Sequence, residues 1–432
     1  MARGKAIAGP LARTATLASL SIAVPRALPI VVVLLAIFVA AGRAATLPEL
    51  TDFHCFWTAG RLVLEGTDPY DPVRWAGAIG GPFADATGTV RPAPCPGGFG
   101  YPLSTAIVFL PLAAIPESVA AAVWAAVLVV GAAFGVALVW SAAGGRRSGL
   151  FLFATIVGFS QPLWLTTINL QFGGLLLGLV GVVSVAAGGV KERLGGVALG
   201  ALVLKPHVVF LVFVEAGIRA IRERRFVPIV LAGATSVTLL LIAFVAEPGW
   251  LGSWVTELLG TRREMLPRQA TAWSLSADTF GDARLGALFV VVVAVAAAWT
   301  LRRVPLSGVD RVGLAVCGSL LVTPYAGSHD QLLLALPWAI VLAVAFAQPA
   351  PASTALLTGL ILCSSLLPWT LYAYALRARP DEATAWLVTA ATTLLLAGAI
   401  RMRPVASAAS SPAASSHTRA RDRSTREASP GS

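Results

Sequence analysis

Ionisable side chains interrupt the apolar stretches of this sequence at a few positions where they could do chemistry. Lys205 lies in the middle of the apolar residues 194–218, His329 and Asp330 precede another apolar stretch, and Asp52 follows the first one. A charged group inside a membrane segment is costly, and it marks a functional site by default. Lys205 is therefore the first candidate for a site, and the other three residues are candidates because they lie where polar groups gather at the ends of apolar stretches.

Each candidate also has a purely structural explanation. Lys205 could extend its ammonium group to a nearby membrane surface if its segment were one straight helix. His329 with Asp330 could be a satisfied pair that closes a helix end. Asp52 could be an ordinary polar residue of the membrane interface, and Gln171 could serve only to hold helices together. Lys205 is the strongest candidate, because its position is the most costly.

Composition places these residues in a membrane protein. Of 432 residues, 57% are hydrophobic and 12% are charged, whereas soluble chains carry about 25% charged residues. The charge-free stretches are residues 27–42, 118–145, 148–190, 226–246, 285–301, 331–376 and 383–400. Most are long enough for a transmembrane helix, which needs roughly 20 apolar residues. The sequence therefore predicts an all-α, polytopic membrane protein.

The basic residues define a topology. The formal net charge of +11 does not indicate a nucleic-acid partner, because the basic residues form short clusters rather than one basic face. Such clusters in short loops mark the cytoplasmic side; they are Arg146 with Arg147, Lys191 with Arg193, Arg219 to Arg225, and Arg302 with Arg303. The predicted spans are residues 27–45 (uncleaved), 117–142, 149–168, 171–190, 226–246, 284–301, 309–323, 331–348, 353–371 and 383–400. Both termini are then cytoplasmic.

Two apolar segments do not fit a simple span. Pro206 interrupts residues 194–218, which predicts two short helices that meet at Lys205 and return the chain to the cytoplasm, for a total of about twelve helices. Residues 103–116 are too short for a full span and are expected on the outer membrane surface. We therefore expect one transmembrane domain over residues 1–400, with residues 46–116 as an extracytoplasmic loop carrying membrane-surface helices, and a disordered cytoplasmic tail over residues 401–432.

This topology gathers reactive groups on the outer side of the membrane. Two long outer loops are predicted, residues 46–102 and 247–283, and the second carries arginines against the usual positive-inside bias. The polar residues expected in these loops or at the same level are Asp52, Gln171, Arg262, Arg263, His329 and Asp330. These groups are expected on the side of the membrane opposite to the cytoplasm, which holds ATP and nucleotide sugars.

The cysteines indicate a disulfide rather than a metal site. Cys55 and Cys95 share the first outer loop, where the oxidising exterior permits a bond between them, whereas Cys317 and Cys363 lie within spans. Two free thiols in that loop are the alternative. The sequence has no CxxC motif, no cluster of His and Cys, and no glycine-rich loop after a strand. We therefore expect neither a metal nor a cofactor.

Several motifs resemble glycosyltransferase family 87, a family of GT-C type enzymes that use polyprenyl-phosphate mannose. The first outer loop carries the similarity from Asp52 to Gly60 and from Leu64 to Pro72. Further similar segments are Phe99-Gly100-Tyr101-Pro102-Leu103, Leu110-Pro111-Leu112, Gly195 to Gly200 leading to Lys205-Pro206, and Thr323-Pro324-Tyr325 before His329-Asp330. They occur in the family's order over most of the chain, so the resemblance implies a GT-C-like membrane fold.

The chain also departs from the family pattern in three places. Leu103 follows Pro102 where a second proline is common, and Gly173 stands two residues after Gln171 where the family usually has asparagine. The family's Asn-Gln-Ser-Leu element is present only as Ala272-Trp273-Ser274-Leu275. These differences concern the sugar and the acceptor more than the class of reaction.

The resemblance implies an inverting transfer of a sugar, mannose in the family, from a polyprenyl-phosphate donor to a glycolipid or glycan acceptor outside the membrane. A base must take the proton of the acceptor hydroxyl, and Asp52 is the candidate. Positive groups must stabilise the departing lipid phosphate, and Lys205, His329 and the loop arginines could do so. The expected donor-binding and acceptor-binding residues are Tyr101, Gln171, Lys205, Arg262, Arg263, His329 and Asp330.

Two other classes of protein must be considered. A transporter or lipid flippase also has broken helices and an intramembrane lysine, but it is expected to show matching interrupted segments in its two halves, and these are absent from the sequence. A structural protein of the cell envelope would explain the spans but not the gathered polar residues. Sugar transfer is therefore the preferred hypothesis, and a transporter or flippase is the alternative.

Overall fold

The computed structural model describes residues 35, 39, 42 and 47–403, except 85–89, 92–93, 96, 188–190, 304–305 and 379–381. For residues 84, 91, 261–263, 294 and 297–303 it describes the backbone alone. The predicted first span, residues 27–45, lies almost entirely outside the described residues. So does nearly all of the predicted disordered tail, residues 401–432.

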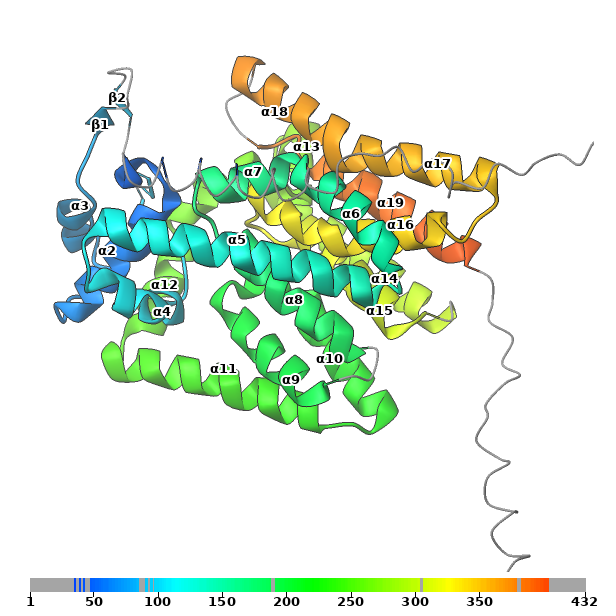
Figure 1. Ribbon diagram of the computed structural model, residues 1–432. Helices are drawn as coiled ribbons and strands as arrows, with labels where there is room; N and C mark the ends of the chain where they lie inside the picture. The colour runs from blue at the N-terminus through cyan, green and yellow to red at the C-terminus, as the bar shows by residue number, and fades with distance from the viewer. Residues whose placement is uncertain are drawn as a thin grey trace, which may run out of the picture.

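Helices make up nearly all of the described chain (Figure 1). The helices are α2 (Asp52–Leu64), α3 (Pro72–Ile79), α4 (Leu103–Ala113), α5 (Glu117–Ala142), α6 (Arg147–Gly158), α7 (Gln161–Ile168), α8 (Gly173–Ala187), α9 (Glu192–Ala201), α10 (Phe210–Glu223), α11 (Val227–Ala246), α12 (Trp250–Leu259), α13 (Ala272–Phe280), α14 (Gly286–Arg303), α15 (Gly308–Val322), α16 (Ala335–Ala345), α17 (Ala350–Ile361), α18 (Leu367–Ala378) and α19 (Trp386–Met402). Short helical turns are η2 (Pro48–Leu50), η3 (Leu202–Leu204), η4 (Pro206–Val208), η5 (Thr261–Arg268), η6 (Ala283–Leu285), η7 (Ser328–Leu334) and the π-turn η8 (Leu362–Leu366). Strands β1 (Phe83–Ala84) and β2 (Val90–Arg91) form a small antiparallel pair.

The membrane character predicted from composition is confirmed. Among the described residues, four helical segments are long and apolar enough to cross a bilayer: Glu117–Ala142, Val227–Ala246, Ser328–Ala345 and Ala350–Ala378. The pair α6 and α7 would make a fifth if it forms one span. The count of about twelve spans and their directions stay predictions.

The segment predicted as one span over residues 149–168 is bent instead. Helices α6 and α7 meet at an angle of 63°. Pro162 lies in the first turn of α7, where it has no N–H to donate and its ring would clash with the carbonyl of residue 158 in a continuous helix. The chain therefore changes direction at Phe159 and Ser160, which directs α7 toward η7, with which it is in contact.

The predicted break at Lys205 is present. Helix α9 runs into the turn η3, Lys205 has a non-helical backbone with φ −141° and ψ 67°, and Pro206 begins the turn η4 before α10 starts. The far ends of α9 and α10 line one cavity, so the two helices return the chain toward the side from which it came. Lys205 is therefore located at the turn of a helical hairpin.

Small residues bring the central helices α5 and α8 together. A Cβ atom on Gly131 of α5 would lie 2.9 Å from the carbonyl oxygen of Gly174 of α8, and one on Gly135 would lie 2.7 Å from the backbone of Leu177. Such close backbone contact is typical of membrane helix pairs that use small residues. This packing fixes the start of α8, and with it the preceding residue Gln171.

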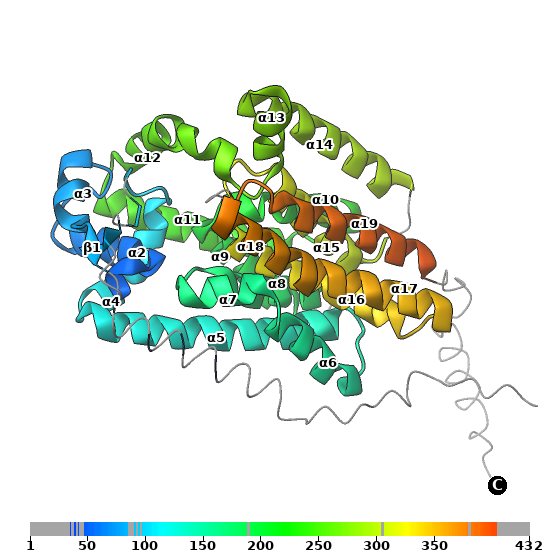
Figure 2. The same cartoon turned by 90° about the horizontal axis from the view of Figure 1, so that it is seen from above.

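The first loop packs as a helical cap on one end of the bundle (Figure 2), where α2, α3, α4 and α12 gather. Helix α4 lies against α2, with Gly60 and Ala113 at the contact. The structure joins Cys55 of α2 to Cys95 by a disulfide with a Cα–Cα distance of 6.3 Å. Residues 103–116, expected on the membrane surface, thus contain a short helix packed on α2.

Candidate functional site

Asp52 is the first residue of α2 and is anchored by its backbone. Its N–H donates to the carbonyl of Asn169 at the end of α7, with an N···O distance of 3.1 Å. Its side chain is half-buried. The amide group of Gln171 donates to Oδ2 of Asp52 at 2.7 Å. The backbone hydrogen bond and the Gln171 amide therefore fix the position of Asp52 and of its Oδ2 atom.

The turn that carries Gln171 is held tightly. Leu170 has a left-handed backbone with φ 53°, a conformation that costs a residue with a side chain free energy unless its surroundings impose it. The indole N–H of Trp124 donates to the carbonyl of Leu170 at 2.9 Å, and Gln171 is itself buried. Helix α5 therefore fixes the turn through Trp124, and the turn directs Gln171 at Asp52.

Tyr101 connects this carboxylate to a second cluster. Nε2 of Gln171 lies 3.3 Å from the Tyr101 hydroxyl, and Nζ of Lys205 lies 5.7 Å from the centre of the Tyr101 ring. Phe56 contacts Tyr101 edge-on, with ring centres 5.0 Å apart. The aromatic core of the first loop thus positions Tyr101 between Gln171 and Lys205.

Lys205 forms a buried ion pair. Its ammonium group lies 2.6 Å from Oδ1 of Asp330, and the two side chains are 3% and 1% exposed. Nε2 of His329 lies 3.4 Å from Nζ of Lys205 and 3.4 Å from Oδ2 of Asp330. Lys205 therefore does not extend to a membrane surface, and His329 and Asp330 do more than close a helix end.

The short helix η7 shapes this cluster. The N–H of Gly327 donates to Oδ2 of Asp330 at 3.1 Å, and the hydroxyl of Thr166 donates to the carbonyl of His329 at 2.9 Å. Gly173 packs against the same place, since a Cβ atom there would lie 2.5 Å from the Thr166 hydroxyl and 3.1 Å from the His329 carbonyl. A larger side chain at this glycine would therefore displace Thr166, which holds the His329 carbonyl.

Glu382 belongs to the site and was missed in the sequence. Its Oε2 accepts the N–H of Ser328 at 2.7 Å, and the side chains of Glu382 and His329 flank Gly327, where a Cβ atom would have no room. Glu382 is distant in sequence and stands in a turn before α19, so only the packing of α19 against η7 brings it here. No sequence motif could have identified it.

Burial dominates the electrostatics of the groups that flank the cluster. Burial raises the pKa of Tyr101, and the Lys205 ammonium only partly offsets this. Burial also raises the pKa of Glu382, while His329 and the Ser328 N–H act in the opposite direction. Tyr101 therefore remains a neutral hydroxyl at neutral pH, able to donate a hydrogen bond.

A small cavity adjoins Glu382. It has a volume of about 20 Å³ and is lined by Gln331, Tyr372 and Glu382, among others, which is room for one water molecule. Oε1 of Gln331 is buried without a hydrogen-bond partner among the described residues. A water molecule in this cavity would satisfy it.

The remaining predicted site residues have no described contact with the Lys205 cluster or lie in the disulfide. The structure describes only the backbone of Arg262 and Arg263, in η5, so their role stays a prediction. Ligand atoms of Asp52, Cys55 and Cys95 lie within 4.8 Å of one another, but the two sulfurs are bonded to each other, and metals bind thiolates. This group is therefore not a metal site while the disulfide is intact.

The arrangement combines two chemical functions. Asp52 offers a carboxylate that can accept a proton, and the Lys205, His329 and Asp330 cluster offers N–H donors and positive charge nearby. Tyr101 and Gln171 lie between them. Such a site can remove a proton from one molecule and stabilise negative charge on another.

A comparison with protein-family models finds glycosyltransferase family 87 over residues 99–324. The match includes Tyr101, Gln171 and Lys205, whereas Asp52, His329 and Asp330 lie outside it and are joined to it by the contacts described above. No curated protein matches the chain. Because the family match covers more than half of the sequence, the chain belongs to glycosyltransferase family 87.

Proposed function

We propose that the protein transfers mannose, with inversion at the sugar carbon, from a polyprenyl-phosphate donor to a glycolipid or glycan acceptor at the extracytoplasmic face of the membrane. The observation that supports this most is the placement of Asp52 beside the Lys205 cluster, with Tyr101 and Gln171 between them. The family supplies the class of reaction. Mannose and the lipid donor rest on the resemblance.

Asp52 acts as the general base. The hydrogen bonds to its carboxylate from the described residues use Oδ2, so Oδ1 is available to an acceptor hydroxyl. The hydroxyl oxygen forms the new bond to the sugar carbon as the bond from that carbon to the phosphate oxygen breaks. The proton passes to Asp52, and the electron pair leaves with the polyprenyl phosphate.

Lys205 and His329 stabilise the departing phosphate. Asp330 holds Lys205 in place by the buried ion pair, and a preorganised donor of this kind needs no rearrangement as charge develops. Gln171 orients Asp52, and Tyr101 presents its hydroxyl to the space between Asp52 and Lys205. Arg262 and Arg263, in the second outer loop, contribute further positive charge for the donor.

The test is sugar transfer by the purified, reconstituted full chain from a labelled polyprenyl-phosphate mannose. Asp52→Asn should lower the rate about 10²- to 10⁴-fold, because asparagine retains the shape but cannot take the proton. The matched control is Asp71→Asn, an exposed residue of the same loop that caps α3; asparagine also caps helices well, so this variant should stay active.

Near-normal transfer by Asp52→Asn would rule out Asp52 as the base, and Glu65, Asp68 and Asp330 would be tested next. If the wild-type protein moves a lipid or solute across the bilayer and forms no glycosidic bond, the enzyme proposal fails and a carrier function replaces it.

A further inference from the structure

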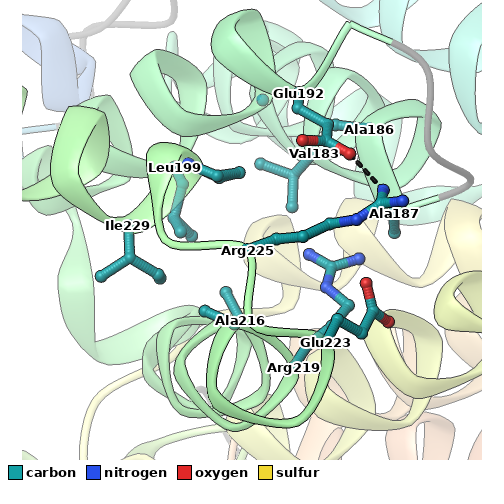
Figure 3. A pocket seen from close by; sticks show the side chains of 13 residues that line it. Val183, Ala186, Ala187, Glu192, Leu199, Ala216, Arg219, Glu223, Arg225 and Ile229 are labelled. Atoms are coloured by element: carbon teal, nitrogen blue, oxygen red, sulfur yellow. Dashed lines mark hydrogen bonds and ion pairs between the residues drawn. The ribbon is translucent and has the colours of Figure 1, made fainter.

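A cavity of about 450 Å³ lies between α8, α9, α10 and α11 (Figure 3). Gln171 lies two residues before the start of α8, whereas Val183, Ala186 and Ala187 at the other end of α8 line the cavity. Fifteen residues of helix span about 22 Å at 1.5 Å per residue. The cavity is therefore a separate site, at the end of the bundle that the basic clusters assign to the cytoplasm. Its volume is that of a small-molecule site.

One side of the cavity is charged. Arg219, Glu223, Arg225 and Glu192 line it, and Figure 3 shows the guanidinium groups of Arg219 and Arg225 close together. Arg225 donates to Glu192. Arg219 approaches Glu215 only at 3.9 Å, and its Nη1 is buried with no hydrogen-bond partner among the described residues. A buried donor without a partner is costly, so Nη1 is a ready position for a ligand oxygen.

The balance of charge restricts the ligand. Each arginine already has a glutamate beside it, Glu192 for Arg225 and Glu215 for Arg219. Glu223 also lines the cavity and makes no ion pair within the described part of the chain. Glu223 is exposed at the edge of the cavity, so a headgroup with negative charge alone would leave this carboxylate to water. A headgroup that joins a phosphate to an ammonium group can satisfy both Arg219 and Glu223.

The opposite side of the cavity is apolar and leads to the lipid-facing surface of α11. Val183, Leu199, Ala216 and Ile229 line it. Beyond them α11 exposes apolar side chains along its length, among them Val230, Val237 and Leu241. Acyl chains of a bound lipid would continue along this surface and make van der Waals contact with its apolar side chains.

We propose that this cavity binds an aminophospholipid of the adjacent leaflet, with its phosphate on Arg219 and Arg225, its primary ammonium on Glu223 and its chains against the apolar wall. The helices that surround the cavity also lead to the active site, since α8 begins after Gln171 and α9 and α10 flank Lys205. The bound lipid thus contacts one end of the helices whose opposite ends carry the site.

Native mass spectrometry of the full-length protein, titrated with lipids of identical acyl chains, tests the proposal without sugar transfer. Phosphatidylethanolamine should bind at least tenfold more tightly than phosphatidylglycerol or phosphatidylcholine. Arg219→Gln should weaken this binding tenfold or more, and Glu223→Gln should remove the preference over phosphatidylglycerol. Ala216→Leu fills the cavity while leaving every charge in place, and it should also abolish binding.

Arg222→Gln is the control, because Arg222 is exposed on the same helix and does not line the cavity. Equal affinity of the wild type for the three lipids would overturn the proposal. Unchanged lipid binding by Ala216→Leu would also overturn it, because this variant retains the ion pair of Arg219 with Glu215 and removes only the space. Soluble phosphoethanolamine provides the remaining comparison. If it binds as tightly as the lipid, the apolar wall has no role and the site is not a lipid site.

Discussion

Replacing Lys205 by methionine would remove the ammonium group and leave a side chain of similar length. Asp330 is 1% exposed and lies 2.6 Å from that ammonium. Removing one partner of a buried ion pair costs about 3–5 kcal/mol of stability, because the other charge remains buried and uncompensated. We therefore expect Lys205→Met to lower the free energy of unfolding by about that amount.

The double variant Lys205→Met/Asp330→Asn separates stability from function. It removes both charges, and asparagine can still accept the N–H of Gly327 as Asp330 does. Replacing a buried pair by neutral groups is often close to neutral in stability, so most of the loss should be recovered. Sugar transfer should stay about 10²- to 10³-fold low, as when one donor to developing charge is removed.

Unfolding in mixed micelles with increasing denaturing detergent, followed by tryptophan fluorescence, measures the stability of each variant. The reconstituted assay measures its sugar transfer. Lys191→Met, which removes an exposed lysine, is the control and should change neither. A double variant with wild-type transfer would show that Lys205 serves only the fold. A single variant as stable as the wild type would refute the buried pair itself.

Three further predictions concern the surroundings of the site. Cys55→Ser should destabilise the first loop by about 4 kcal/mol in the chain-entropy model, because Cys55 and Cys95 are 40 residues apart. Limited proteolysis of the loop measures this loss of stability. Equal resistance of the oxidised and reduced protein to the protease would contradict the prediction. Burial, the largest single effect, lowers the pKa of His54, but the hydrogen bond and charge of Glu117, the Ile79 carbonyl and the charge of Glu49 together raise this pKa above its ordinary value. The stabilisation by this pair should be full below about pH 6.5 and lost as the pH rises through the higher folded-state pKa, so thermal unfolding of His54→Gln should lack that pH dependence. Gly327→Ala should slow transfer about tenfold or more, because a methyl group there overlaps the neighbouring imidazole and carboxylate; wild-type turnover would show that the imidazole can move freely.

The sequence predicted the helices well because apolar length and basic clusters act locally. The expected span 117–142 coincides with α5, and the break at Lys205 follows from its own neighbour, Pro206. The bend between α6 and α7 was missed, although Pro162 stood in the segment, because hydropathy averages over the position where a helix turns. Local signals therefore sufficed wherever a single segment determines its own shape.

The site could be predicted only in part. Lys205 was identifiable by the cost of placing a charge inside a membrane segment, and Asp52 and His329 by their place in the polar outer segments that resemble the family. Their mutual arrangement was not, because it depends on contacts between distant segments, such as Gln171 with Asp52. Glu382 gave no signal at all, since an acidic residue before a final span is ordinary until α19 packs against η7.

The ion pair of Lys205 and Asp330 has a consequence for how the chain is made. The two residues are 125 positions apart, and ribosomes add about 5–20 residues per second. Asp330 is thus synthesised about 6–25 s after Lys205. During that time Lys205 lacks its ion-pair partner Asp330, and its position at the turn of the helical hairpin allows the ammonium group to remain hydrated. The buried ion pair can form only after η7 has been synthesised, so the candidate site is completed late in biosynthesis.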